Sequence, residues 1–305
     1  MKKHLFSLAL GVMTLTACTS EEVVDVSPTQ GNAIGFENIV DKNARAIEGD
    51  LTTSTFDNFM VYGYYTKEGM TTPVQIFNGV PVSKVNNKWS YDGVRYWVPK
   101  CTYFFYAYSC ADIALTVGKG SPALTLTNET TVDGRALAIM GYLCDGTHQH
   151  DLVYAEKEGI IGSEKDNPQV ALEFKHALCK MKAVFTTDFP AGYQVKISNV
   201  RISEFDSRGD FNVGTGAWKN HKSDPDAYIN LAVDENKNTM TNAPGSSVET
   251  AEIFLIPKQY PGTEFVKLHF SIELTKDGEV VLQRNITGAW SPQWEGAHVY
   301  RYNIN

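Results

Sequence analysis

The chain has 305 residues, of which 43% are hydrophobic, and it carries a formal net charge of −8. That much apolar sequence is enough for packed cores, so the composition excludes a disordered protein, and the length suits one large or two ordinary domains. The acidic balance, without a cluster of Lys and Arg, also argues against nucleic acid as a partner, because its phosphates require such clusters.

The N-terminus has the pattern of an export signal. Lys2 and Lys3 precede an uncharged apolar stretch, residues 5–15, which is far shorter than the ~20 residues that a membrane-spanning helix needs. It runs into Leu15-Thr16-Ala17-Cys18, the lipobox pattern of an apolar residue and two small residues before a cysteine. We therefore predict a signal peptide over residues 1–17 and a lipid on Cys18 that anchors the chain to a membrane. The alternative is an ordinary signal peptide with a chance cysteine.

Four further cysteines are present: Cys101, Cys110, Cys144 and Cys179. An exported protein permits disulfides, and four cysteines allow three pairings. Their apolar and aromatic neighbours are equally compatible with buried free thiols. The sequence leaves the pairing open.

The remainder of the chain has the pattern of an all-β protein. Short alternating or wholly apolar runs are separated by turn residues, and no sustained amphipathic helix is found, which is typical of β-sandwiches. The expected strands are Ala33–Val40, Phe59–Tyr65, Val74–Phe77, Tyr96–Val98, Thr102–Tyr108, Ala136–Leu143, Leu152–Ala155, Val195–Ile202, Val266–Leu274, Val280–Ile286 and His298–Ile304.

Several local details refine this prediction. The run Thr102–Tyr108 is aromatic on both of its faces, which indicates a strand that is buried on both sides. The polar run Glu156–Pro168 is a natural domain boundary. The phase of the apolar alternation reverses near His176, which predicts a bulge or break there, although a helical turn also fits the spacing. The tripeptide Lys276-Asp277-Gly278 predicts a hairpin turn.

Chemical signatures are missing. The sequence has no G-x-S-x-G, H-E-x-x-H, P-loop or G-x-G-x-x-G motif, so we expect neither an enzyme nor a cofactor. His148 and His150 could share a strand face and hold a metal, but a third ligand is missing, and a solvated loop is favoured. We interpret His176 as a core histidine satisfied by the backbone. Arg208-Gly209-Asp210 is interpreted as a polar turn between strands rather than an adhesion tripeptide.

Several local patterns together resemble the fimbrillin family, the type V pilins and their Mfa-like relatives. The most specific is Val170–Lys180 (VALEFKHALCK), which is similar to the family's F-x-H-A-L-x-K signature. Weaker resemblances lie in the aromatic run Tyr96–Tyr108, in Asp151–Ala155 (DLVYA), in Leu255–Gln259 and in the closing segment Trp294–Tyr302. Their order and spacing agree with the family from the lipobox to the C-terminus.

The resemblance implies two tandem transthyretin-like β-sandwich domains, over residues 46–165 and 166–305. They follow a lipidated propeptide, residues 18–45, that contains the first strand. It also implies assembly by donor-strand exchange with other fimbrial subunits. In the family, an arginine-specific protease at the outer membrane cuts after an Arg in the linker, and the matching position here is Arg45, before Ala46. On local sequence alone, Arg45 is an ordinary solvated linker residue.

Stalk subunits of the family carry a C-terminal extension that serves as the donor strand, whereas this chain stops at Asn305, directly after the closing strand. We therefore expect a tip or accessory subunit at the cell outer membrane or in the fimbrium, with a host or bacterial surface ligand as a further partner. The alternative function is a surface glycan-binding lipoprotein that keeps its lipid anchor. Trp89, Trp218 and Trp290 would then be the candidates that stack on sugars, although aromatic residues more often belong to a core.

Overall fold

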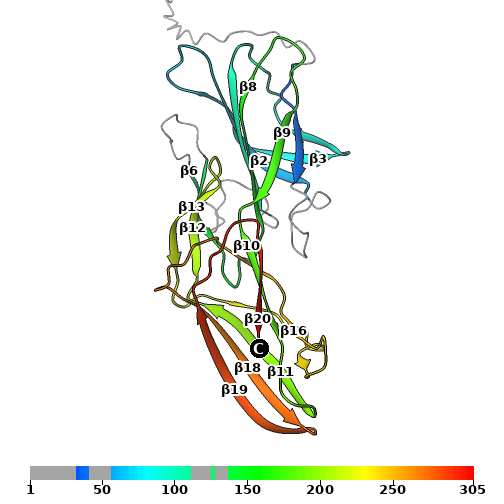
Figure 1. The fold of residues 1–305 in the computed structure, drawn as a ribbon. Coiled ribbons are helices and arrows are strands. Elements are labelled where there is room, and N and C mark those ends of the chain that lie inside the picture. Colours follow the sequence, from blue (N-terminus) through cyan, green and yellow to red (C-terminus); the bar gives the residue numbers. More distant parts are fainter. Residues whose placement is uncertain (1–31, 41–55, 111–124, 128–136) are drawn as a thin grey trace, which may run out of the picture.

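Strands account for all the regular structure that the computed structural model shows in the residues it describes: 32–40, 56–110, 125–127 and 137–305. No helix in these ranges is long and apolar enough to cross a membrane. The strands form two bodies that lie end to end in an elongated molecule (Figure 1). The all-β prediction is confirmed.

The upper body in Figure 1 is built on a seven-stranded sheet. Its strands, in spatial order, are β1 (Phe36–Val40), β9 (Val170–His176), β8 (Leu152–Ile161), β5 (Thr102–Cys110), β2 (Asn58–Thr66), β3 (Val74–Val85) and β4 (Lys88–Tyr91). The sheet rolls up so that its two outermost strands approach each other, with the rings of Phe36 on β1 and Tyr91 on β4 only 5.8 Å apart. The roll encloses an aromatic core.

Strand β5 lies at the centre of this sheet and is buried on both faces, as its sequence predicts. Tyr103 and Phe105 point into the core inside the roll. Tyr106 and Tyr108 belong to a second core on the opposite face. A strand in such a position has no polar face, which explains why its aromatic residues follow one another without alternation.

The second core is covered by a four-stranded sheet of β13 (Ala217–Ser223), β12 (Asp206–Asn212), β7 (Ala138–Leu143) and β6 (Thr125–Thr127). Strands β12 and β13 come from the second half of the chain and pair with each other, and β12 also pairs with β7 from the first half. The ring of Phe211 on β12 packs edge-on against Tyr154 on β8, 4.8 Å away, so the two sheets are held together by aromatic contacts.

Two further sheets form the lower body around one shared core. One contains β16 (Val248–Glu249), β10 (Cys179–Phe185) and β17 (Ile253–Leu255), with β20 (Val299–Ile304) parallel to β10. The other contains β14 (Tyr228–Asn230), β11 (Tyr193–Ser203), β18 (Val266–Lys276) and β19 (Glu279–Trp290), with β15 (Thr239–Met240) beside β11.

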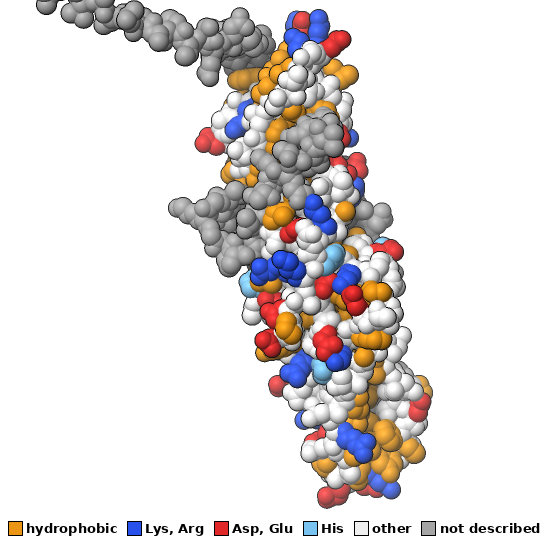
Figure 2. All heavy atoms as spheres, turned by 90° about the vertical axis from the view of Figure 1, so that its left-hand side faces the viewer, with side chains coloured by type: hydrophobic (Ala, Val, Ile, Leu, Met, Phe, Trp, Pro, Cys, Tyr) orange, Lys and Arg blue, Asp and Glu red, His pale blue; other side chains and the backbone are white. Residues whose placement is uncertain are grey.

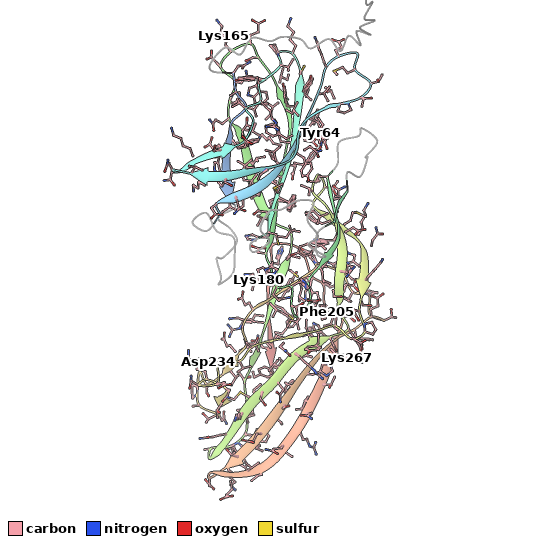
Figure 3. The ribbon with its side chains drawn as sticks, turned by 180° about the vertical axis from the view of Figure 1, so that it is seen from behind. Tyr64, Lys165, Lys180, Phe205, Asp234 and Lys267 are labelled. Atoms are coloured by element: carbon pink, nitrogen blue, oxygen red, sulfur yellow. The ribbon has the colours of Figure 1, made fainter. Side chains whose placement is uncertain are left out.

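The chain passes from the upper body to the lower one between β9 and β10. Strand β9 ends at His176 and β10 begins at Cys179, so the break predicted from the phase reversal is confirmed, and the helical alternative is wrong. Lys180, at the start of β10, lies between the bodies in Figure 3. Its ammonium group sits 4.5 Å from the ring centroid of Phe254, which allows this nearly buried cation to be stabilised by the aromatic face.

Two details of the expected strands differ in the structure. The strand expected over Leu152–Ala155 is longer, because residues 156–161 continue β8 and pair with β5. Tyr96–Val98 is not a strand, since Tyr96 makes only an isolated bridge with Ala33. The composition of residues 156–161 conceals the strand, because β5, with which they pair, lies far away in the sequence.

On the face seen in Figure 2, acidic and basic side chains are interspersed along the middle of the molecule.

The predicted hairpin is confirmed and allows a test of its turn. Asp277 and Gly278 connect β18 to β19 with φ values of 52° and 89°, a left-handed backbone that favours Gly at the second position.

We expect Gly278→Ala to lower the free energy of unfolding by about 1 kcal/mol or more. Gly262→Ala is the control, because Gly262 also faces open space but has no positive φ. Urea titration of both variants provides the measurement. Equal free energies of unfolding for the two variants would contradict this explanation.

Candidate strand-exchange site

Residues 32–40 complete the upper body by pairing on two sides. On one side, β1 runs parallel to β9, with Phe36 opposite Val170 and Val40 opposite Phe174. On the other side, the backbone N–H of Ile34 donates to the carbonyl of Arg95 at 2.8 Å, and that of Trp97 donates to Asn32 at 3.0 Å. The segment therefore joins β9 to the loop that follows β4.

Side chains of this segment fill the core inside the roll. Ile34 and Phe36 are only 1% and 3% exposed. The ring of Phe36 packs edge-on against those of Phe59 at 5.8 Å and Phe105 at 5.9 Å, with interplanar angles of 86° and 88°. Burial of one Phe contributes roughly 1.5–3 kcal/mol, and each aromatic pair adds about 0.5–1.5 kcal/mol. Loss of the segment would leave an apolar groove.

Polar contacts tie the same segment to the loop after β4. The hydroxyl of Tyr91 donates to the carbonyl of Ile34 at 2.6 Å, and the side-chain amide of Asn32 donates to the carbonyl of Trp97 at 3.0 Å.

The expected lipidation residue Cys18 and the expected processing site at Arg45 and Ala46 lie outside the described residues.

A second candidate feature lies where the two bodies meet. The Nδ1 atom of His176 is 2.9 Å from Oδ2 of Asp151, a carboxyl that is completely buried. The side chain of His176 is only 9% exposed, as expected for a core histidine, and its Nδ1 faces a carboxyl group. Asp151 opens the DLVYA segment and His176 lies in VALEFKHALCK, so the contact joins two segments that resemble the family.

Neighbouring groups close the same junction. The indole N–H of Trp218 donates to the carbonyl of Ala177 at 2.8 Å, and the backbone N–H of Ala297 donates to the carbonyl of Leu178 at 2.9 Å. The two residues that connect β9 to β10 thus have their carbonyls satisfied by partners from both bodies. A hollow of about 610 Å³ beside them is lined by Lys175, Lys258 and Trp294, among others.

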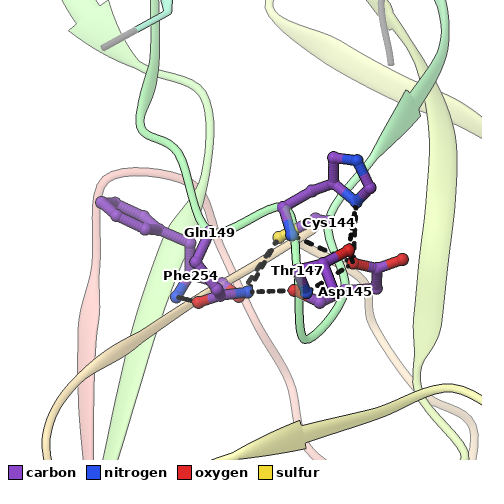
Figure 4. A network of polar contacts seen from close by, with 6 residues as sticks. Cys144, Asp145, Thr147, Gln149 and Phe254 are labelled. Carbon is purple, nitrogen blue, oxygen red and sulfur yellow. Dashed lines mark hydrogen bonds and ion pairs between the residues drawn. The ribbon is translucent and has the colours of Figure 1, made fainter. Parts of the chain in front are cut away.

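Figure 4 shows a third tie between the two bodies. The side-chain amide of Gln149 donates to the carbonyl of Phe254 at 3.2 Å and accepts from its backbone N–H at 2.8 Å. The Cys144 thiol donates to the same carbonyl at 3.2 Å.

His148, considered as a metal ligand, instead contacts Asp145 through Nδ1 at 2.9 Å. No group of residues in the described ranges is arranged to hold a metal ion.

The cysteines Cys101, Cys110, Cys144 and Cys179 are all buried free thiols. Burial raises the pKa of the thiols of Cys101, Cys144 and Cys179 above the ordinary value, because the thiolate would lose its hydration. Each of these three groups is therefore held in its unreactive, protonated form. Of the two options that the sequence leaves open, the structure has free thiols.

Arg208, Gly209 and Asp210 do not form a turn, which corrects the interpretation from sequence. They belong to β12, and the Asp210 carboxylate is 8% exposed. Its two oxygens accept from the backbone N–H of Gly141 and from the side chain of Asn220, both at 2.7 Å. This carboxylate is occupied within the sheet and is not presented to a receptor.

The three tryptophans proposed for sugar stacking are half-buried and packed. Trp89 lies 5.1 Å from Phe59, Trp218 lies 4.9 Å from Phe211, and Trp290 lies 5.1 Å from Tyr302, measured between ring centroids. Their packing against neighbouring rings gives them a structural role, which weakens the case for a glycan-binding protein that relies on them.

Comparison with solved structures shows which known proteins share this fold. The fold is similar to that of a fimbrial protein from Bacteroides vulgatus, with a TM-score of 0.60 and 15% identity over 90% of this chain and 95% of that one. It is also similar to a candidate cell-adhesion protein from Bacteroides ovatus, with a TM-score of 0.50 and 15% identity over 90% of this chain and 92% of that one. No curated protein matches the sequence.

The chain belongs to the fimbrillin-like family, whose model matches residues 44–305. The family resemblance seen in the sequence is thereby confirmed. Because this is a family of fimbrial structural proteins, the expectation of a non-enzymatic protein is confirmed as well. Membership implies a location at the cell surface and association with other fimbrial subunits.

The role of Phe36 in holding the first strand can be measured. We expect Phe36→Ala to lower the free energy of unfolding of the full-length protein by about 3–5 kcal/mol, because it empties a pocket among aromatic rings. Glu37→Ala changes the neighbouring exposed residue of the same strand and should cost less than about 0.5 kcal/mol. Equal losses in a urea titration would show that β1 is not anchored by this ring.

The pair Asp151–His176 should be similarly important for the junction. We expect Asp151→Ala to lower the free energy of unfolding by about 3 kcal/mol, because it leaves the nearly buried His176 without the carboxylate that it faces. Lys175→Ala removes the adjacent pair with Glu156, where the lysine side chain is 49% exposed, and should cost less than about 1 kcal/mol. A small effect of Asp151→Ala in the same titration would contradict a structural role for the pair.

Proposed function

We propose that this protein is a fimbrial subunit that is exported as a lipoprotein, with its lipid on Cys18. An arginine-specific protease at the outer membrane then cuts between Arg45 and Ala46, and the subunit joins other fimbrial subunits through donor-strand exchange. The supporting observation is the position of residues 32–40, which pair on both sides and bury Ile34 and Phe36, shortly before the cut.

The physical consequence of the cut supports this order of events. Loss of β1 would leave the backbone groups of β9 unpaired at an edge and would expose a groove lined by Phe59, Phe77 and Phe105. An extended segment of another subunit can supply the missing hydrogen bonds, and its alternate side chains can fill the groove. Until the cut, the protein's own strand occupies this site, so the lipidated precursor cannot polymerise.

The sheets described above support two transthyretin-like domains in tandem. We assign residues 46–165 to the first and 166–305 to the second, after the signal peptide 1–17 and the propeptide 18–45. Strand β9 and the β12–β13 hairpin would then be segments of the second domain that pair with strands of the first. Such an exchange of strands makes the two domains mechanically continuous.

A tip or accessory position is supported by the pairing of β20. All residues of this strand, Val299–Ile304, pair with β10 within their own sheet. The described part of the C-terminal segment is thus occupied and is not available as a donor strand. Before processing, the subunit would reside at the outer membrane, and afterwards it would lie in the fimbrium, where it can meet a host or bacterial surface ligand.

The proposed cut can be tested by replacing the residue that the protease must recognise. We expect Arg45→Ala to abolish processing, so that the cell-surface protein keeps an acylated Cys18 and does not enter fimbriae, whereas the parent begins at Ala46. Lys42→Ala removes the same charge three residues earlier and should be processed normally. N-terminal sequencing and mass spectrometry of surface material provide the measurement.

Two results would overturn parts of this proposal. A parent protein that retains the Cys18 lipid in its final state would favour a glycan-binding lipoprotein that keeps its anchor. Cross-linking mass spectrometry of assembled fimbriae tests the tip position separately. If residues 298–305 of this subunit were found inserted into a neighbour, the subunit would be a stalk component.

A further inference from the structure

The outer face of the sheet that contains β11, β18 and β19 has a hollow of about 480 Å³ in the lower body of the molecule. Polar side chains line it, including those of Asn199, Arg201, Asn230, His269, Ser271 and Asn285. It is distant in the fold from β1 and has no part in the proposed strand exchange.

The strand register brings these side chains together. Arg201 on β11 lies between Asn230 on β14 and His269 on β18, while Ser271 on β18 lies opposite Asn285 on β19. A β-bulge between Ser198 and Arg201 adds one residue to β11. Bulges of this kind redirect side chains, and they are common beside functional sites.

The bulge places Asn199 on the polar face. This residue has a φ of 53°, a left-handed conformation that Asn tolerates better than most residues. Its side-chain amide donates to the hydroxyl of Ser271 at 3.2 Å, and that hydroxyl donates to the side-chain oxygen of Asn285 at 2.8 Å. No other described residue bonds the amide oxygen of Asn199 or the amide N–H groups of Asn285, so these groups are available to a ligand.

His269 is held rigidly beside them. Its Nε2 lies 2.8 Å from the hydroxyl of Ser203, and its Nδ1 lies 3.0 Å from the hydroxyl of Thr287. Burial, followed by the nearby cations of Arg201 and Lys267, lowers the pKa of His269 below its ordinary value, so the ring is neutral at neutral pH. The fixed positive charge at the hollow therefore comes from Arg201.

Arg201 is an exposed cation for which the described residues supply no counter-ion. Within the described ranges, its guanidinium makes neither an ion pair nor a side-chain hydrogen bond, whereas the nearby Lys267 pairs with Glu204 at 2.6 Å. The guanidinium lies 5.7 Å from the ring centroid of Tyr228, which is itself 49% exposed. A planar guanidinium that has no ion pair with a described residue is free to form a forked pair with a carboxylate.

We propose that this hollow binds an acidic saccharide, whose carboxylate pairs with Arg201. The side chains of Asn199, Asn230 and Asn285 would bind its hydroxyl groups. The ring of Tyr228 does not line the hollow but lies beside Arg201, where it would cover an apolar face of the sugar. A saccharide with one charged group fits better than an acidic peptide, because one unpaired cation is surrounded by uncharged hydrogen-bonding groups.

Binding of glucuronate and N-acetylneuraminate to the purified full-length protein, with glucose as the neutral control, tests the proposal. We expect both acids to bind and glucose to bind at least ~10-fold more weakly, because it lacks the carboxylate. Arg201→Gln should weaken binding of the acids by ~10-fold or more. Arg284→Gln, which removes an exposed arginine of β19 outside the hollow, should leave it unchanged.

Saturation-transfer NMR can detect such weak complexes, and thermal unfolding checks that both variants remain folded. The saccharide proposal would be overturned by equal binding of glucose and glucuronate, by no binding of either acid, or by unchanged binding in Arg201→Gln. A glutamate-rich peptide that binds better than either acid would also overturn it. Each of these results is independent of Arg45 processing, so the strand-exchange proposal does not stand or fall with them.

Discussion

The upper body depends on the pairing of one short segment with β9 and with the loop that follows β4. Residues 32–40 are bonded to β9 on one side and to residues 95–97 on the other, and Phe36 packs among the rings inside the roll. Backbone pairing and apolar burial therefore act at the same place. For this reason, removal of one strand would affect the edge of the sheet and the aromatic core at the same time.

The two bodies are joined by more than the passage from β9 to β10. The Asp151–His176 contact, the Trp218–Ala177 hydrogen bond and the double hydrogen bond of Gln149 with Phe254 all cross this region. Buried polar groups need partners, and here each of them finds one from a different part of the chain. The connection between the two bodies is therefore distributed over several contacts.

Several elements follow from local patterns in the sequence, and others do not. The two-face aromatic run predicts the central position of β5, and Asp277-Gly278 predicts the hairpin, because both signals reside in adjacent residues. The polar residues 156–161 conceal a strand, since hydrogen bonding to β5 outweighs their composition. Arg208–Asp210 have the composition of a turn, but they pair with β7 and β13 and therefore form part of a strand.

Local pattern was thus sufficient for the all-β class, for many of the strands and for the resemblance to a fimbrial family, because alternation and turn chemistry are properties of neighbouring residues. The tertiary structure alone decided that β1 pairs with β9, that the β12–β13 hairpin joins β7, and that His176 faces Asp151. It also decided that Arg201 lies in a polar hollow with the amides of Asn230 and Asn285 from two other strands. Such contacts depend on strand register between distant segments, which the sequence of one segment does not contain.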